Sequence, residues 1–404
     1  MITTINNKHK KLNFSSEREQ SQACLNSAEH EKNQGRKVLN VPNLRFKEFQ
    51  GEWEKTKFGD IAVVVGGGTP DTNTSQYWNG KIQWFTPSEI GRNKYVYNSV
   101  RTISEEGLNK SSAKLLPTGT ILLSSRATVG ECSINKKECT TNQGFQSLIP
   151  KENISNEFVY YLIQTKRKDL IRKSCGSTFL EISANEVRKI VVSIPTIKEQ
   201  DKIAKLLSLL DERIATQNKI IDKLQSLIRG IAQNIVRNNK PNVCLSECLE
   251  CKSSTLQECD VCEQGTYPVY GANGIVGYLD KYNTEDEAVY IIKDGSGVGT
   301  VSYVTGKCSA TGTLNTLQAK EGYSLQYLYY LLKVFNFEPY KTGMAIPHIY
   351  FKDYGKAKFF CPSYIEQLQY AQSLSAIDSK LLVEKNILTS LSMQKQYLLR
   401  QMFI

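Results

Sequence analysis

The feature that most constrains this 404-residue chain is an internal repeat. The run FVYYLIQTKRKDLI, which begins at Phe158, is similar to YLYYLLKVFNFEPY, which begins 169 residues later at Tyr327. The same spacing aligns three shorter matches: Cys139 with Cys308, Gln146 with Asn315, and Val129-Gly130 with Val298-Gly299. Self-similarity at a fixed spacing indicates duplicated structural units, so we expect two related halves.

Beyond these matches the spacing falls to 167 residues, because the second half is two residues shorter. The shorter spacing aligns Gly176 with Gly343, Pro195 with Pro362, Glu199-Gln200 with Glu366-Gln367, and Asp211 with Asp378. In both halves the proline separates a segment of mixed character from a long helical pattern. Each half is therefore predicted to be a mixed segment followed by one long helix.

Both long helices are expected to start at a capping box, Thr196-x-x-Glu199 in the first half and Ser363-x-x-Glu366 in the second. Apolar residues then recur in the first helix at a 4-3-4 spacing that is typical of a coiled-coil seam. They are Ile203, Leu207, Leu210, Ile214, Ile221, Leu224, Ile228, Ile231 and Ile235. The equivalent positions of the second helix are Tyr370, Leu374, Ile377, Leu381, Glu384, Leu388, Leu391, Lys395, Leu398 and Met402.

A single helix of this length would leave its apolar stripe exposed over ~48 Å, at ~1.5 Å per residue. We expect the two helices to cover each other as an antiparallel coiled coil, the alternative being two amphipathic helices that each lie on their own domain. One polar residue interrupts each seam, Gln217 and its equivalent Glu384. We predict that these two side chains lie close together and help to fix the register.

The segments before the helices place the chain in the α+β class. Residues 120–134 and 145–150 alternate like strands, and residues 157–167 form an amphipathic helix pattern, as do their counterparts in the second half. We expect a disordered extension (1–40), a first globular domain (41–195), a long central helix (196–243), a second globular domain (244–362) and a C-terminal long helix (363–404).

The composition favours a polyanionic partner, since 51 Lys and Arg residues against 40 Asp and Glu residues leave a net charge of +11. No run approaches the ~20 apolar residues of a membrane-spanning helix. The N-terminus lacks the apolar core of a secretory signal. We therefore expect no membrane association and a cytoplasmic location, with the 11 cysteines in a reducing compartment.

Enzyme signatures are missing from the sequence. The run GSGVGT at 295–300 lacks the Lys-Ser/Thr of a phosphate-binding loop, and its third glycine is misplaced for a dinucleotide site. Only three histidines are present, His9, His30 and His348, too few in one domain for a histidine-based metal site or catalytic triad. We therefore predict no catalytic residues.

Four cysteines have spacing that resembles a zinc site, Cys248-x-x-Cys251 and Cys259-x-x-Cys262. Aligning FGDIAVV (58–64) with LSECLEC (245–251) puts the first two at positions that are apolar in the first half. That alignment favours buried thiols that act as small hydrophobic side chains. We predict no bound metal, with zinc at these cysteines as the open alternative.

Two loop-like runs have the composition of a binding surface. YWNGKIQWFTPSEIGRNK (77–94) and YPVYGANGIVGYLDKY (267–282) combine aromatic residues, amides, glycines and lysines. Amides and aromatic rings read base edges, and lysines pair with phosphates. The competing interpretation is that the aromatic residues are core and the glycines form turns. Two similar but non-identical readers suit a target with two parts.

With these motifs the chain resembles the specificity subunit of type I restriction–modification systems. The resemblance is carried by VPNLRFKEFQGEWEKTKFGDI (41–61), YWNGKIQWFTPSEI (77–90), TTNQGFQSLIP (140–150), YPVYGANGIVGY (267–278), and the helix starts at Pro195 and Pro362. It covers nearly the whole chain from Val41 and leaves the first forty residues outside.

The resemblance implies that each globular domain is a target-recognition domain that reads one half of a split sequence in double-stranded DNA. The paired helices set the gap between the halves and dock modification subunits. Those subunits resemble adenine methyltransferases that use S-adenosylmethionine, and restriction subunits add translocation and cleavage that need ATP and Mg²⁺. The chain itself would hold no cofactor and no active site.

We expect the DNA contacts to come from polar and aromatic residues in the loop-like runs. They are Tyr77, Trp78, Asn79, Lys81, Arg126 and Gln143 in the first domain, and Tyr270, Asn273, Lys293, Ser296 and His348 in the second. The helix pair is expected to pack through Ile203, Leu207, Leu210, Ile214, Gln217, Leu374, Ile377, Leu381, Glu384 and Leu388. Two other functions stay open, a self-sufficient DNA methyltransferase or nuclease fragment and a protein-interaction scaffold.

Overall fold

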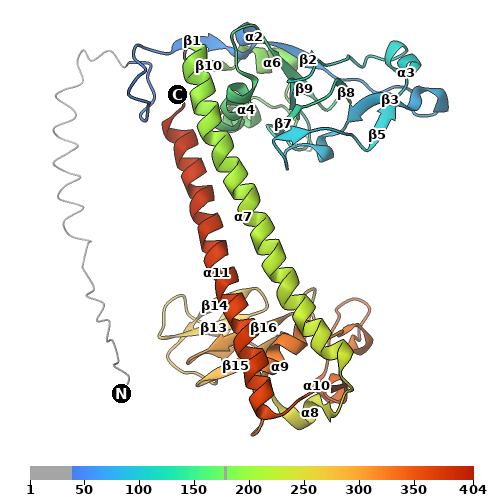
Figure 1. Cartoon of the computed structure of the whole chain (residues 1–404), viewed down its shortest axis with the longest axis vertical. Helices are drawn as coiled ribbons and strands as arrows, with labels where there is room; N and C mark the ends of the chain where they lie inside the picture. Colours follow the sequence, from blue (N-terminus) through green and yellow to red (C-terminus); the bar gives the residue numbers. More distant parts are fainter. Residues whose placement is uncertain (1–38, 177–179) are drawn as a thin grey trace, which may run out of the picture. The chain divides into compact units, whose positions relative to one another are not determined.

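The computed structural model describes residues 39–176 and 180–404, so nearly all of the extension predicted over residues 1–40 lies outside the described residues. The chain divides into two compact units (Figure 1). The first comprises residues up to Leu207 together with Gln396–Ile404, and the second comprises Ser208–Lys395. The boundaries fall within the two long helices, α7 (Ile197–Asn238) and α11 (Tyr364–Gln401).

The first unit is built on a five-stranded sheet with a smaller three-stranded sheet beside it. In spatial order the large sheet consists of β2 (Ala62–Gly66), β9 (Gln146–Pro150), β6 (Ile121–Leu123), β7 (Cys132–Asn135) and β4 (Tyr95–Val96). The small sheet consists of β5 (Arg101–Ile103), β3 (Trp78–Phe85) and β8 (Cys139–Thr141), and β1 (Glu54–Lys57) pairs with β10 (Val191–Ile194). The short helices are α2 (Phe58–Ile61), α3 (Glu105–Asn109), α4 (Asn156–Thr165), α5 (Arg167–Arg172) and α6 (Ala184–Lys189).

The second unit repeats this plan with a four-stranded sheet. In spatial order the strands are β12 (Leu249–Ser253), β18 (Leu314–Ala319), β15 (Glu287–Ile292) and β16 (Val301–Thr305). A three-stranded sheet contains β14 (Gly274–Leu279), β13 (Tyr267–Gly271) and β17 (Ser309–Ala310), and β11 (Val243–Cys244) pairs with β19 (Lys358–Phe359). The short helices are α8 (Leu245–Cys248), α9 (Leu325–Leu332) and α10 (Phe351–Tyr354).

The repeat seen in the sequence extends to individual backbone contacts. In the first unit the amide of Phe58 donates to the carbonyl of Ile190 at 3.0 Å, and in the second the amide of Leu245 donates to Ala357 at the same distance. Val64 pairs with Leu148 across β2 and β9, as Cys251 pairs with Leu317 across β12 and β18. Each small sheet contains one parallel pair, β3 with β8 and β13 with β17. The predicted α+β duplication is confirmed.

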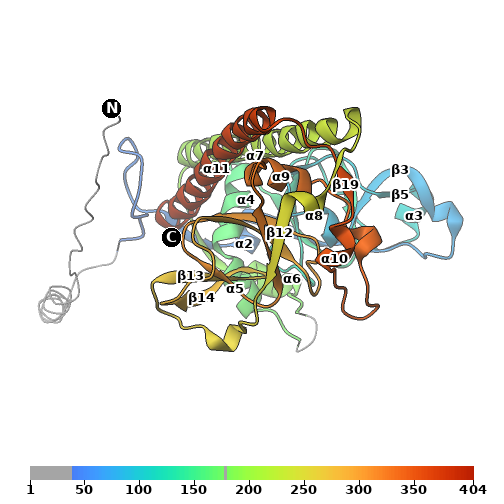
Figure 2. The ribbon, with the colours of Figure 1, turned by 90° about the horizontal axis from the view of Figure 1, so that it is seen from below.

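One helix in each unit, α4 in the first and α9 in the second, packs its apolar side chains against the main sheet. Residues Phe158–Ile163 of α4 are all buried, and so are all but one of the residues of α9. In the second unit α9 lies between the sheet and α11, and its tyrosines and leucines join the same core as Ala371 and Leu374 (Figure 2). Each Å² of buried apolar area contributes ~25 cal/mol, so these buried side chains are a main source of stability in each unit.

Within the second unit α7 and α11 run antiparallel side by side (Figure 1). Asp211 pairs with Lys395 at 2.6 Å, and further along α7 Gln217 donates to the backbone carbonyl of Glu384 at 3.0 Å and to its carboxylate. The predicted closeness of Gln217 and Glu384 is confirmed. Since the two are equivalent positions of the repeat, their contact marks a pseudo-two-fold axis through the helix pair.

Apolar residues of the helix seam also pack into the cores of the globular units. The helices therefore pack against each other, as in the coiled-coil alternative, and against the domains, as in the other alternative. Ile203 and Leu207 are buried in the core of the first unit, together with Met402 near the end of α11. Leu210 is buried and Ile214 half-buried, and Leu374 and Leu381 are buried in the second unit with Ile377 and Leu388 half-buried beside them. Each long helix therefore covers both a partner helix and a domain face.

One of the two predicted capping boxes is wrong. Ser363 and Glu366 at the start of α11 exchange the expected hydrogen bonds, since the amide and hydroxyl of Ser363 donate to the carboxylate and the amide of Glu366 donates back at 3.4 Å. At the start of α7 the carboxylate of Glu199 instead accepts two hydrogen bonds from Arg45, both at 2.8 Å, and one from Trp53 at 3.3 Å. A buried carboxylate gains more from a guanidinium fork than from a neutral backbone amide.

Candidate nucleic-acid interface

A loop and a hairpin in the second unit bring three predicted contact residues together. The loop after β15 carries Lys293 and Ser296, and the hairpin from Thr342 to His348 lies against it. The amide of Gly295 donates to Pro347 at 2.9 Å, and the amide of Ile349 donates to Lys293, also at 2.9 Å. Paired amides and carbonyls of Thr342 and His348 close the hairpin at 2.8–2.9 Å. The structure therefore brings Lys293, Ser296 and His348 onto two neighbouring loops that backbone hydrogen bonds connect.

The hairpin tip exposes apolar and aromatic side chains. Met344 is fully exposed and Ile346 is 66% exposed. The His348 ring hydrogen-bonds through Nδ1 to the carbonyl of Ile346 at 3.1 Å and packs edge-on against Tyr350. The φ of +89° at Gly343 explains why a glycine begins the turn, since a side chain there would meet the carbonyl of Ile346 at 2.4 Å.

The first unit contains the equivalent loops with different side chains. The amide of Ile182 donates to the carbonyl of Ser125 at 3.0 Å, which matches the bond between Ile349 and Lys293. Arg126 forms an ion pair with Glu181 at 2.8 Å where the second unit brings Asp294 beside His348. Gly144 accepts from the amide of Ser125 at 2.8 Å. This bond brings the loop of Arg126 next to that of Gln143, whose side chain accepts a hydrogen bond from Thr69.

Four further predicted contacts follow each other along the outer end of β3. Asn79 and Lys81 are exposed, and Asn79 has a φ of +61° at an irregularity in the pairing of β3 with β5. Tyr77 is half-buried. Trp78 is 9% exposed, packs edge-on against Trp84 at 5.1 Å, and donates from its indole to the carbonyl of Asp71 at 3.0 Å. Trp78 is therefore a packing residue in this structure and has no free face for a base.

Sequence reasoning missed Arg101, which completes this region. Its guanidinium carbon lies 3.6 Å from the centroid of the Trp78 ring and 5.4 Å from that of Trp84, while the residue stays exposed. A guanidinium this close to an indole ring is attracted by the ring face, which restricts its orientation while the residue stays exposed. The signal available in the sequence was an arginine on a short strand, and only the pairing of β3 with β5 puts it over the tryptophan.

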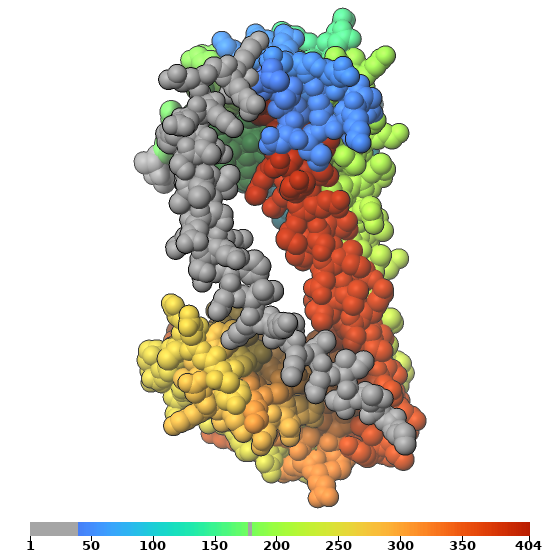
Figure 3. Space-filling view, turned by 90° about the vertical axis from the view of Figure 1, so that its left-hand side faces the viewer, coloured from blue at the N-terminus to red at the C-terminus, as the bar shows by residue number. Residues whose placement is uncertain are grey.

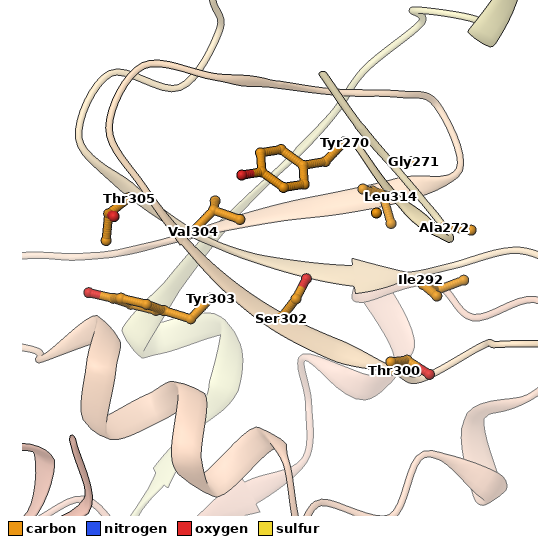
Figure 4. Close-up of a pocket in the computed structure, with 11 residues that line it drawn as sticks. Tyr270, Gly271, Ala272, Ile292, Thr300, Ser302, Tyr303, Val304, Thr305 and Leu314 are labelled. Atoms are coloured by element: carbon orange, nitrogen blue, oxygen red, sulfur yellow. The ribbon is translucent and has the colours of Figure 1, made fainter. Parts of the chain in front are cut away.

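The hairpin of β13 and β14 covers a hollow of about 380 Å³ over the sheet of the second unit (Figure 4). Tyr270 and Ser302 point into this hollow, and Thr300 and Leu314 help to line it. Burial raises the pKa of Tyr270, so the phenol stays protonated and can donate a hydrogen bond at neutral pH. Asn273 is exposed in the turn between the two strands.

The four cysteines considered for zinc do not form a metal site in the structure. Cys248 is fully buried at the end of α8, at the position that Ile61 occupies in the first unit. Burial raises the pKa of the Cys251 thiol to about 11, so without a metal this side chain is protonated at neutral pH. Cys259 and Cys262 are exposed. Across residues 39–176 and 180–404, no three His, Cys, Asp or Glu side chains are grouped so that they could hold a metal ion.

Comparison with known proteins matches both halves of the chain to one family. Residues 50–226 and residues 241–393 each match the family described as type I restriction modification DNA specificity domain. The chain belongs to this specificity family. The double match covers most of the sequence and follows the duplication described above, so both halves are specificity domains.

Relatives within the specificity family are similar over part or most of their length. The type I restriction enzyme MjaIX specificity subunit of Methanocaldococcus jannaschii is 40% identical over 180 residues, which are 43% of this chain and 42% of that protein. The chain thus spans less than half of that relative in the alignment. The EcoprrI specificity subunit of Escherichia coli is 24% identical over 363 residues, which are 81% of this chain and 88% of that protein.

A solved structure shows the same fold. The S subunit of a type I restriction–modification system from M. genitalium matches with a TM-score of 0.63 and 19% identity, covering 90% of this chain and 99% of that one. The helices within the described residues are also too short or too polar to cross a lipid bilayer.

Proposed function

We propose that this chain is the non-catalytic, DNA-reading subunit of a type I restriction–modification complex. In this proposal residues 41–195 and 244–362 are two target-recognition domains, and each reads one half of a split sequence in double-stranded DNA. The helix pair of α7 and α11 sets the gap between the two halves and docks the modification subunits.

The observation that carries this proposal is that equivalent loops are held by equivalent hydrogen bonds but carry different side chains. Arg126 and Glu181 in the first unit stand where the second has Asp294 and His348. Arg pairs with guanine, and Asp accepts from the amino group of cytosine. Recognition of two different half-sites requires this combination of an equivalent loop backbone and different side chains.

The predicted contact residues, together with Arg101, divide by chemistry into three kinds of contact. Lys81, Arg101, Arg126 and Lys293 would pair mainly with phosphates or guanine, since their charge suits both. Asn79, Gln143, Asn273, Ser296 and His348 would read base edges. Tyr77 and Tyr270 would contribute partly exposed rings, and Trp78 would act indirectly by orienting Arg101.

Exposed apolar side chains on the long helices support a docking surface for modification subunits. In α7 these include Ile220 at 37% and Leu227 at 49% exposure, and in α11 they include Leu382 at 61% and Ile387 at 39%. Ile220 and Ile387 are equivalent positions of the repeat. The outer side of α11 between its ends is open in the space-filling view (Figure 3). Ile220 and Leu227 are seven residues apart, so they lie on one face of α7, and exposed apolar side chains on one face favour an interaction surface.

The chemistry of the complex would then lie on the other subunits. Modification subunits would hold S-adenosylmethionine, and restriction subunits would use ATP and Mg²⁺ in the cytoplasm. The two alternatives, a self-sufficient methyltransferase or nuclease fragment and a protein-interaction scaffold, predict different behaviour of the purified chain.

Mapping of methylated adenines in cells with and without this chain tests the proposal. We expect methylation at a sequence of two short parts separated by a fixed gap, and its loss when the chain is deleted. The purified chain with S-adenosylmethionine, ATP and Mg²⁺ should neither methylate nor cut DNA. Modification by the chain alone would favour the enzyme alternative. A binding affinity for random DNA that does not fall with rising salt would favour the scaffold.

A further inference from the structure

Gln200 forms a buried link between the start of α7 and the core of the first unit. Its side chain is 1% exposed. The amide nitrogen donates to the carbonyl of Pro195 at 2.9 Å, and the amide oxygen accepts from the backbone amide of Ser155 at 3.0 Å. Ser155 is the residue that precedes α4, whose side chains fill the domain core. One side chain thus connects the first turn of α7 to the first turn of α4.

Gln367 forms the same link in the second unit. It is 2% exposed, donates to the carbonyl of Pro362 at 2.9 Å, and accepts from the amide of Ser324 at 2.9 Å. Ser324 is the N-cap of α9. The two glutamines are equivalent in the repeat, and their four distances agree within 0.1 Å. We call each of these linkages a glutamine joint.

Only an amide side chain satisfies both partners. The proline carbonyl needs a donor, and the serine amide needs an acceptor, so glutamate or lysine at this position would leave one of them unpaired. A buried backbone group without a partner cannot hydrogen-bond to water either, so leaving it unpaired is unfavourable. The joint therefore favours the one geometry in which both hydrogen bonds form. Rotation of the domain about the helix start would break both hydrogen bonds together.

We propose that Gln200 and Gln367 are positioning residues that hold each recognition domain at a fixed angle to its long helix and so restrict the gap that the complex accepts. This inference rests on the function proposed above. The rise of one base pair is about 3.4 Å, so a small rotation at the joint shifts a reading loop by a comparable distance. Rigid joints are therefore needed for the complex to reject sites whose gap is wrong by one base pair.

The test uses the complete complex of this chain with its modification subunits. Q200M and Q367M keep the length and bulk of the side chain but remove both hydrogen-bonding groups. Q369M, on the exposed side of α11 two residues away, is the matched control. Methylation rates are measured on DNA with the correct gap and with gaps one base pair shorter and longer, and thermal unfolding is measured for each variant.

We expect Q200M and Q367M each to reduce the preference for the correct gap about tenfold, with the sequence of the two half-sites unchanged. Because the joints lie in different compact units, their effects should multiply in the double variant. Q369M should behave as wild type. If Q200M fails to fold, Q367M tests the proposal at the equivalent joint of the second unit, and the same loss of gap preference is expected there.

A lower melting temperature with an unchanged preference for the correct gap would overturn the proposal, since the glutamines would then be structural only. Equal loss of methylation at all gaps would overturn it as well. A wild-type complex with no gap preference at all would contradict the proposed function itself, which separates the two failures.

Discussion

Arg101 is an exposed arginine that lies over an aromatic pair, and this contact would orient it for the polyanionic partner proposed above. Its guanidinium lies over the Trp78 ring, and Trp78 is held in turn by Trp84 and by the carbonyl of Asp71. An arginine that is already oriented loses less side-chain entropy when it binds phosphate or guanine. At the residue scale, recognition in the proposed function would therefore depend on buried aromatic residues as well as on the exposed donors.

Replacing Arg101 by alanine should weaken binding of the chain to DNA about tenfold and lower the slope of log affinity against log salt by ~1. Lysine at this position should restore the slope but only part of the affinity, because an ammonium group cannot stack flat on indole. Arg172→Ala is the control, since that arginine is exposed and pairs within its own helix with Asp169. Unchanged DNA affinity in Arg101→Ala, measured by salt titration, would remove Arg101 from the interface.

Glu199, at the start of α7, is expected to contribute to the stability of the fold. Replacing it by alanine removes the carboxylate that pairs with Arg45, which keeps its hydrogen bonds to the carbonyls of Gln50 and Gly51. It also removes the acceptor of the Trp53 indole. We therefore expect a loss of about 3 kcal/mol in the free energy of unfolding. Lys189→Ala removes an exposed ion pair with Glu186 and should change stability by less than about 0.5 kcal/mol. The free energy of unfolding of both variants is measured by denaturant titration. Equal losses would contradict a stabilising role for the contacts of Glu199 with Arg45 and Trp53.

The duplicated fold and the helix pair could be predicted from the sequence more reliably than the individual contact residues. The repeat and the heptad spacing depend on local periodicity, which is visible in one dimension, so the duplication, the helix pair and the meeting of Gln217 with Glu384 were predictable. The burial of Trp78 and the role of Arg101 depend on strand pairing across about twenty residues of chain. An aromatic, amide and lysine run has the same composition whether a given ring is core or surface.

At the scale of elements, the polar pair at the centre of the seam specifies how α7 and α11 meet. Gln217 and Glu384 are both buried although an apolar pair would pack there without desolvation of polar groups. A polar residue at a seam position selects one register, because any shift leaves it unpaired among apolar side chains. The position of this pair on the pseudo-two-fold axis lets one contact set the register for both helices.

The pH dependence of this element follows from Glu384. Hydrogen bonds from Lys380 and Gln217 hold the pKa of Glu384 below its ordinary value of 4.5. A carboxyl group whose pKa is lowered by folding stabilises the folded state above the ordinary value, and that stabilisation is lost as the pH falls through the lowered pKa. The melting temperature of wild type should therefore exceed that of Glu384→Gln at neutral pH. The difference should shrink below about pH 4. A difference that is constant with pH would contradict this assignment.

At the scale of the whole molecule, the proposed function requires two recognition domains connected by a helical spacer whose length is set by its number of heptads. Each unit has its own core, and the long helices contribute side chains to both. A change in helix length should therefore alter the spacing of the half-sites without altering which bases each domain reads.

Insertion of one heptad into α7 and one into the facing part of α11 tests this central claim most directly. The seam stays in register, since both helices gain the same two turns. The added length is ~10 Å, which corresponds to about three base pairs. Genome-wide mapping of methylated adenines should then show both half-sites unchanged and the gap between them about three base pairs wider. Methylation at the original gap by the lengthened chain would contradict the account.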